Sequence, residues 1–147
     1  MGKDHLDEWL GDIQWDVIHF NWGLHDLVSN EGGTDTRLLM NSAILPYRDN
    51  LQFLCARLKQ TGAQLVLATT TPVPSELNYL PGMVEALNEV ARSTALENGI
   101  VVNDLYSATY LRLTELQYRN DVHFNDLGTE ILASDTVSSA LAALGYP

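Results

Sequence analysis

Residues 15–27 read WDVIHFNWGLHDL, a short apolar run followed by a polar loop. The run Trp15–Phe20 has no polar alternation, which is typical of a strand in a sheet that is covered on both faces. Gly23 permits a tight turn soon after the strand. We therefore expect a buried strand at 15–20 and a loop that extends from Asn21 to about Thr36. Loops of this length within compact domains are often functional.

Further apolar runs continue the same alternation along the chain. Strands are also predicted at 64–70 and 100–104. Helices are predicted at 4–12, 46–61, 81–98, in pieces over 105–118, and at 126–143, with Pro46 in the first turn of the helix 46–61. Strands separated by helices indicate βαβ units and a parallel sheet. Residues 1–147 contain no repeat or linker, so we expect one doubly wound α/β domain whose site lies beyond the carboxyl ends of the strands.

The composition excludes several classes of partner. The chain has 8 Lys and Arg residues against 19 Asp and Glu residues, a net charge of −11, which disfavours binding to nucleic acid and to anionic membranes. Cys55 is the only cysteine, so no intramolecular disulfide is available. The N-terminal segment is charged and no apolar run approaches the ~20 residues of a membrane span. We expect a cytoplasmic protein, unless a preceding segment carries a signal peptide.

The loop Arg119–Asp126, which reads RNDVHFND, holds the strongest candidate for catalysis. His123 follows Asp121 by two residues and lies beside Asn120 and Asn125. A carboxylate close to an imidazole fixes its tautomer and stabilises the imidazolium that forms when the ring accepts a proton. The sequence allows a second interpretation, in which Asp121 and Asn125 only cap the following helix.

The loop after the first strand holds weaker candidates. His25 is expected to face the edge of the sheet as a hydrogen-bond donor, although an exposed histidine in a turn rich in Asn and Asp is the alternative. His5 and His19 are less favoured, and His19 is expected to be structural because it lies inside a strand. Three aromatic residues are interpreted as packing residues, with a place in the cleft as the alternative: Trp22, Tyr79 and Tyr106.

These loops resemble the motifs of one enzyme superfamily. WDVIHFNWGLHDL resembles the strand and Gly-x-Asn-Asp block of SGNH (GDSL-like) hydrolases, and residues 121–128, DVHFNDLG, resemble their C-terminal Asp-His block. Residues 69–74 and 103–106 resemble intervening segments of a bacterial branch. The resemblance extends over residues 4–145. It implies a three-layer α/β/α, flavodoxin-like fold and an enzyme that hydrolyses small carboxylic esters, among them acetyl esters of carbohydrates, without a metal or another cofactor.

Residue by residue, the resemblance implies that His123 is the general base and Asp121 its partner. His25 stands where the superfamily has the asparagine that stabilises the oxyanion. The residues expected to shape the oxyanion site or the cleft are Gly23, Asp26, Asn120 and Trp22. The chain departs from the pattern because the acidic residue usually lies three positions before the histidine, where this chain has Asn120.

The superfamily's nucleophile block has no match in the sequence. Gly11-Asp12 is followed by Ile13, so no Gly-Asp-Ser turn is present. The strand and turn that carry the nucleophile are expected to precede residue 4, which predicts an N-terminally truncated parallel sheet. Hydroxyl groups near the site edge are expected to be caps or turn residues: Ser29, Ser42, Ser75 and Ser107.

The truncation predicts an unpaired strand edge at Trp15–Phe20, which invites pairing with a second copy. We therefore expect a homodimer through this edge. Three functions remain open: an ester hydrolase with an unidentified nucleophile, a non-catalytic remnant or dimerising module, and a metal-assisted hydrolase of esters or phosphoesters. The last would use His25, Asp26, Asp121 and His123 as ligands.

Overall fold

A parallel sheet forms the centre of the molecule. The computed structural model describes residues 2–30, 32 and 35–146. Its strands are β1 (Val17–Phe20), β2 (Gln64–Ala68) and β3 (Val101–Asn103), in the order β1-β2-β3. All pair in parallel, with His19 opposite Val66 and Ala68 opposite Asn103. The predicted parallel sheet is confirmed.

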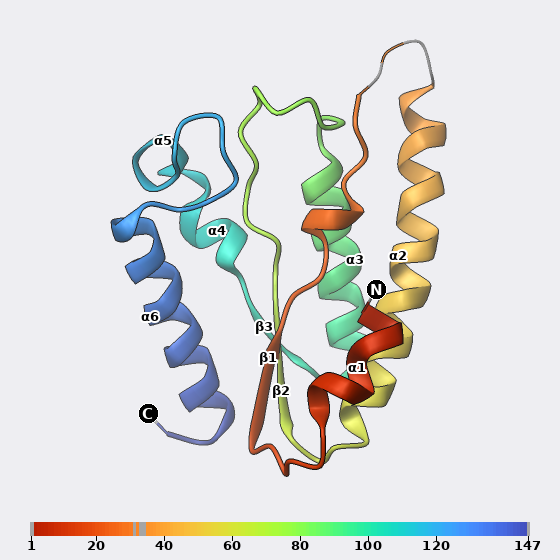
Figure 1. The fold of residues 1–147 in the computed structure, drawn as a ribbon, viewed down its shortest axis with the longest axis vertical. Coiled ribbons are helices and arrows are strands. Elements are labelled where there is room, and N and C mark those ends of the chain that lie inside the picture. Colours follow the sequence, from red (N-terminus) through yellow and green to blue (C-terminus); the bar gives the residue numbers. More distant parts are fainter. Residues whose placement is uncertain (1, 31, 33–34, 147) are drawn as a thin grey trace.

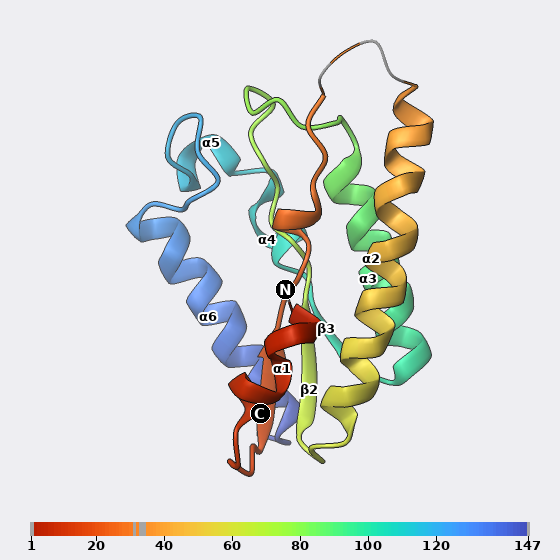
Figure 2. The same ribbon diagram turned by 45° about the vertical axis from the view of Figure 1, so that its right-hand side comes forward.

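Helices cover both faces of this sheet. Figure 1 shows α1 (Gly2–Leu10), α2 (Thr36–Lys59) and α3 (Met83–Asn98) on one side, and α4 (Leu105–Tyr110), α5 (Leu113–Leu116) and α6 (Asp126–Ala143) on the other. Figure 2 shows α1 beside α2, with which it is in contact. The expected three-layer α/β/α arrangement is therefore present. Within the described ranges, no helix combines the length and apolarity that crossing a bilayer requires.

The two faces of the sheet are packed unequally. Leu58 of α2 and Leu87 of α3 are 1% and 0% exposed, so the main core lies on that face. On the other face, α6 buries only Gly128, although the helix is rich in apolar residues. A side chain at Gly128 would meet the carbonyl oxygen of Leu116, which explains why α5 and α6 can approach closely there. The fold therefore depends mainly on the α2 and α3 layer.

Helix α2 begins ten residues earlier than predicted, at Thr36 rather than at 46. Asp35 caps it by accepting a hydrogen bond from the Arg37 backbone N–H at 2.9 Å. Pro46 therefore lies inside the helix and not in its first turn. Pro46 and Ser42, whose carbonyl the proline leaves without its usual helical donor, are both exposed residues, which makes the interruption tolerable.

The loop predicted from Asn21 to Thr36 is accordingly shorter and partly ordered. It contains the 3-10 helix η1 (Leu24–Asp26), while residues 31, 33 and 34 lie outside the described residues. The polar residues and glycines of this segment predicted an irregular loop. The Asp26 backbone N–H, however, donates to the Gly23 carbonyl and closes a tight turn.

Strand β1 is shorter and less buried than expected. It begins at Val17, and of its four residues only Phe20 is buried. The reason is its position, because β1 is an edge strand with β2 on one side and no described strand on the other. The helical pieces predicted over 105–118 form two separate helices, α4 and α5.

Cys55 lies in the core of α2 and is fully buried. Burial raises the pKa of its thiol to about 11, so the reactive thiolate is scarce at neutral pH. These features support a packing role for Cys55.

The chain leaves β2 through a backbone segment that Asn88 of α3 fixes in place. The Thr70 backbone N–H donates to Asn88 Oδ1 at 2.8 Å, and Asn88 Nδ2 donates to the Thr70 carbonyl at 2.8 Å. Asn88 is 1% exposed, so water cannot easily replace these bonds. One side chain thus satisfies both backbone groups of Thr70.

Asn88→Ala is expected to lower the free energy of unfolding by about 2–4 kcal/mol, because it leaves two buried backbone groups without partners. Urea denaturation of the purified protein measures the loss. Asn41→Ala, at an exposed position of α2, is the matched control and should change stability by less than about 0.5 kcal/mol. Equal stability of the two variants would contradict the role given to Asn88.

Candidate active site

His123 and Asp121 form a close pair in the loop between α5 and α6. His123 Nδ1 lies 2.6 Å from Asp121 Oδ1, and the same oxygen accepts the His123 backbone N–H at 3.0 Å. These two hydrogen bonds, the backbone bond first, lower the pKa of the Asp121 carboxyl. The His123 side chain is 78% exposed, so the ring nitrogen that faces away from Asp121 can be reached from solvent.

The capping interpretation holds for Asn125 and not for Asp121. Asn125 is the N-cap of α6 and accepts the Gly128 backbone N–H at 3.0 Å. Asp121 instead holds the His123 ring. The loop around them is closed by a hydrogen bond from the Tyr118 N–H to the His123 carbonyl, and Asn120 takes the left-handed conformation with φ 55°. The geometry of the pair is therefore set within its own loop.

The His25 loop is fastened to the end of β2. Asn21 Nδ2 donates to the Ala68 carbonyl at 2.8 Å and to Thr70 Oγ1 at 3.2 Å. Gly23 has φ 153°, and a Cβ there would clash with Thr70 Oγ1. Only glycine allows this close approach of the loop to Thr70, which supports the predicted shaping role of Gly23.

His25 and Asp26 line a cavity of about 660 Å³ that also includes Trp22, His19 and Asn50. Burial raises the pKa of the Asp26 carboxyl, and the nearby His25 opposes that rise. Trp22 is therefore a cavity residue as well as a packing residue. The cavity continues along α1 and the outer side of β1, where a second space of about 300 Å³ is lined by apolar side chains.

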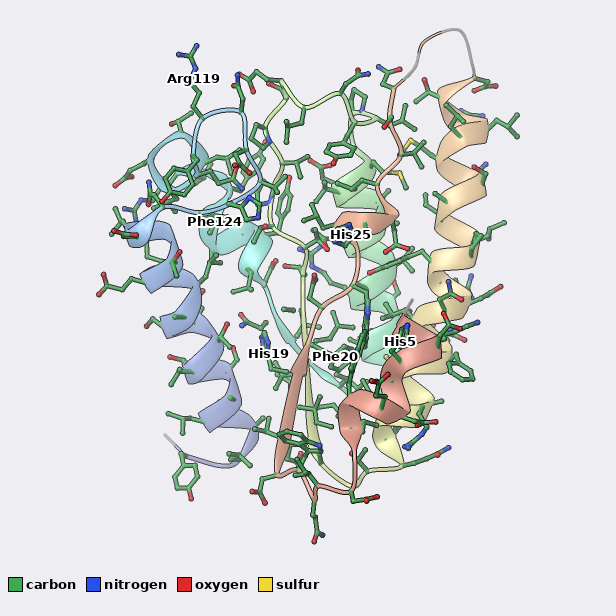
Figure 3. All side chains as sticks on the ribbon, viewed as in Figure 1. His5, His19, Phe20, His25, Arg119 and Phe124 are labelled. Atoms are coloured by element: carbon green, nitrogen blue, oxygen red, sulfur yellow. The ribbon has the colours of Figure 1, made fainter. Side chains whose placement is uncertain are left out.

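The two histidine loops lie at the same end of the sheet but do not share this cavity. Figure 3 shows His25 above the carboxyl end of β1, and Phe124, the neighbour of His123 in sequence, at the start of α6. His123 does not line the 660 Å³ cavity. The predicted residues therefore form two groups, with His25, Asp26, Gly23 and Trp22 in one and Asn120, Asp121 and His123 in the other.

The segment 69–82 connects these groups. On one side its Asn78 carbonyl accepts the Asn30 N–H at 2.8 Å, and the Leu80 N–H donates to the Val28 carbonyl at 2.9 Å. On the other side Gln117, at the base of the His123 loop, donates from Nε2 to the Pro72 carbonyl at 2.9 Å. The segment 69–82 is therefore hydrogen-bonded on one side to residues that follow the His25 loop and on the other to the base of the His123 loop.

Sequence reasoning missed a polar cluster at the end of β3. Thr69 Oγ1 donates to Asp104 Oδ1 at 2.9 Å, and Arg92 reaches the same carboxylate at 3.0 Å. Burial alone would raise the pKa of Asp104, but hydrogen bonds from Ser107 and Thr69, with the charge of Arg92, bring it below its usual value. The threonines directly after β2 and Asn103-Asp104 at the end of β3 were the available signal, because both pairs stand at the carboxyl ends of strands. The cluster holds α4 against β2.

Three of the four serine hydroxyls near the site edge have a local partner, but only Ser75 lies in a turn as expected, because Ser42 lies inside α2 and Ser107 lies in α4. Ser42 donates to the Leu39 carbonyl at 2.7 Å, and Ser107 donates to Asp104 Oδ2 at 2.7 Å. Ser75 Oγ lies 3.3 Å from Glu76 Oε2, whereas Ser29 pairs with Tyr79 through a backbone β-bridge that does not involve its hydroxyl. None of these contacts involves a histidine, so they give no evidence for a serine nucleophile.

The two remaining histidines, His5 and His19, each have a side-chain partner. His19 Nε2 lies 3.2 Å from Asn103 Nδ2, and burial lowers the pKa of the ring, which fits the structural role predicted for it. His5 pairs with Glu8 on the surface of α1. In the part of the chain that the structure describes, no group of three or more His, Cys, Asp or Glu side chains is arranged to hold a metal ion. The proposed metal ligands are thus not gathered into one such group.

Solved structures of esterases share this fold. A lipase/acylhydrolase from Enterococcus faecalis is 21% identical, with a TM-score of 0.69 over 93% of this chain and 67% of that one. An acetylxylan esterase from Geobacillus stearothermophilus is 18% identical, with a TM-score of 0.69 over 99% and 68% of the two chains. Another acetyl xylan esterase is 18% identical, with a TM-score of 0.70 over 94% and 73%. At these identities the likeness establishes the fold.

The sequence comparison is more specific. Among curated proteins no sequence matches the chain. Residues 2–131, however, match the GDSL-like Lipase/Acylhydrolase family, and this range includes both histidine loops. The match confirms the resemblance found in the sequence and supports a hydrolase acting on acyl esters. Because it extends over most of the 147 residues, the chain belongs to the GDSL-like Lipase/Acylhydrolase family.

Proposed function

We propose that this protein hydrolyses acyl esters with His123 as the general base and Asp121 as the residue that orients it. The observation that carries the proposal is the 2.6 Å contact between His123 Nδ1 and Asp121 Oδ1. A carboxylate at Nδ1 favours the tautomer that carries its proton there, which leaves Nε2 free to accept one. Family membership supports the same chemistry.

The proton moves in two steps. As the attacking oxygen bonds to the acyl carbon, its proton passes to His123 Nε2, and Asp121 stabilises the imidazolium. When the bond to the alcohol oxygen breaks, His123 returns the proton to that leaving group. His25 is proposed to donate an N–H to the carbonyl oxygen while it carries negative charge, because it lies at the carboxyl end of β1.

Water is the attacking group that this proposal assigns. Ser42, Ser75 and Ser107, near the site edge, contact a backbone carbonyl or a carboxylate rather than a histidine. A water molecule activated by His123 needs no covalent intermediate. Without a covalent intermediate, the reaction is not divided into two easier steps, so we expect slow turnover.

The proposed substrates are acetyl esters of carbohydrates. Two of the structural neighbours are named acetylxylan esterases, which supports this class as a starting point for assays. Metal-assisted hydrolysis, the alternative, has less support because the described residues offer no ligand group of three or more.

A non-catalytic dimerising module is the second candidate function, and β1 is the observation that favours it. The outer edge of β1 pairs with no described strand, and Trp9 and Trp15 beside it are 55% and 37% exposed. An antiparallel pairing of two β1 edges across a two-fold axis would cover these side chains and satisfy the backbone groups. The homodimer remains a proposal.

The first prediction concerns ester hydrolysis. His123→Ala should reduce the rate of 4-nitrophenyl acetate hydrolysis by about 100-fold or more, since a positioned base contributes about that much. His5→Ala is the matched control, because His5 is also an exposed histidine beside a carboxylate. Equal rates for wild type and His123→Ala would reject the assignment. Loss of activity on chelation, restored by zinc, would favour the metal-assisted alternative.

The second prediction concerns the pKa of the Asp121 carboxyl. Carbon NMR of the Asp121 carboxyl should give a pKa below the usual aspartate range. His123→Ala should raise that pKa only in part, because the backbone N–H of residue 123 still donates. The pairing contributes stability above the pKa of the unfolded chain and loses it as the pH falls through the lowered value. An Asp121 pKa that His123→Ala leaves unchanged would contradict the ring contact.

The third prediction concerns association through β1. Sedimentation at micromolar concentration should give the mass of two chains for wild type, and Trp15→Glu should shift it to one, because a charge at the seam is costly to bury. Leu96→Glu is the matched control on α3, where the leucine is 83% exposed. A wild-type protein that sediments as one chain would rule out the dimer.

A further inference from the structure

A separate pocket lies beyond the carboxyl ends of β2 and β3, outside the groups of residues that hold His25 and His123. It has a volume of about 210 Å³ and lies between the segment 69–82, the first turn of α3 and the helix α4. Its walls are largely proline, leucine and tyrosine, with Glu85 and Ser75 as polar members. Pockets with apolar walls and a few fixed polar groups are typical of small-molecule binding sites.

An exposed aromatic face forms one side of this pocket. Tyr106 and Tyr110 lie one turn apart on α4, and their rings stack with centroids 5.2 Å apart and an angle of 20° between the planes. Tyr110 is 53% exposed, so the outer part of the stack is open to solvent. Tyr79, from the segment 69–82, adds a third ring to the lining. Such a surface can pack against the apolar face of a flat ligand.

A carboxylate is fixed beside this aromatic face. Tyr106 Oη donates to Glu85 Oε1 at 2.7 Å. Burial and the Glu85 charge both raise the pKa of the tyrosine, so the phenol keeps its proton. Glu85 Oε2 can still accept hydrogen bonds from hydroxyl groups of a ligand. The negative charge disfavours anionic ligands and favours neutral ones that carry hydroxyl groups.

A groove connects the pocket to the loop that holds His123. A neighbouring cavity of about 490 Å³ shares Pro74, Ser75 and Leu113 with it and extends to Asn120, the residue before Asp121. The hydrogen bond between Gln117 and the Pro72 carbonyl joins the wall of the pocket to the base of the His123 loop. A ligand that fills the pocket can therefore extend along this groove as far as Asn120, in the loop that also holds Asp121 and His123.

We propose that the pocket formed by Tyr79, Glu85, Tyr106 and Tyr110 binds a neutral sugar unit of an acetylated oligosaccharide, while another unit presents its acetyl group to His123. An acyl chain suits the site less, because it would cover Glu85 and Ser75 without hydrogen bonds and so incur a desolvation cost. Only the placement of the acetyl group at His123 rests on the proposed function. Binding of the sugar itself needs no catalysis.

The test is direct binding of xylohexaose, an unacetylated neutral oligosaccharide, followed by NMR of the tyrosine rings. Wild type should show saturable shifts of Tyr106 and Tyr110 at millimolar concentrations. Tyr110→Ala should weaken binding by about 3- to 10-fold, the loss expected for one aromatic contact. Tyr110→Phe should restore affinity, and Tyr146→Ala, a tyrosine that is 61% exposed near the C-terminus, should leave it unchanged.

Failure of the sugar site and failure of the proposed function give different results. Saturable binding without ester hydrolysis would reject the catalytic assignment and keep the sugar site. Ester hydrolysis without saturable xylohexaose binding would reject the sugar site. Binding that Tyr110→Ala does not weaken, or tighter binding of hexanoate than of xylohexaose at the same rings, would also overturn it.

Discussion

The pairing of the Asn88 side chain with both backbone groups of Thr70 is the constraint on which the rest of the site depends. It fixes the chain where it leaves β2, in the core and away from water. A backbone N–H and carbonyl at this position would otherwise be buried without partners, since the strand has ended and the helix has not begun. These two hydrogen bonds fix the backbone conformation of Thr70.

From this point the polar contacts extend in two directions. Thr70 Oγ1 accepts from Asn21 and leaves room only for a glycine at position 23, which sets the His25 loop. Thr69 Oγ1 accepts the Tyr106 N–H and donates to Asp104, which sets the start of α4 and the tyrosine pocket. Two adjacent threonines therefore position opposite sides of the site. A shift of this backbone would move both sides together.

The sequence predicted what is decided locally. The Asp121–His123 contact spans two residues, and the last helix begins at Asp126 as predicted because Asn125 caps it. The start of α2 and the roles of Asn88 and Thr70 could not be predicted. Pro46 looked like a first-turn residue because proline favours that position, and Asn88 pairs across 18 residues with a backbone that carries no sequence signal. Polar contacts between residues far apart in the chain are therefore not predicted by local sequence patterns.

The two histidine groups rest on helical layers that are packed to different extents. The His25 group rests on the α2 and α3 core through Tyr47, whose hydroxyl donates to the Trp22 carbonyl at 2.8 Å. The His123 group rests on α5 and α6, where α6 buries only Gly128. Fewer buried contacts imply a lower free energy of local opening, so the base side is expected to be the more mobile half. The Gln117 bond to the Pro72 carbonyl then has a clear function, because it ties the looser half to the segment that Asn88 holds.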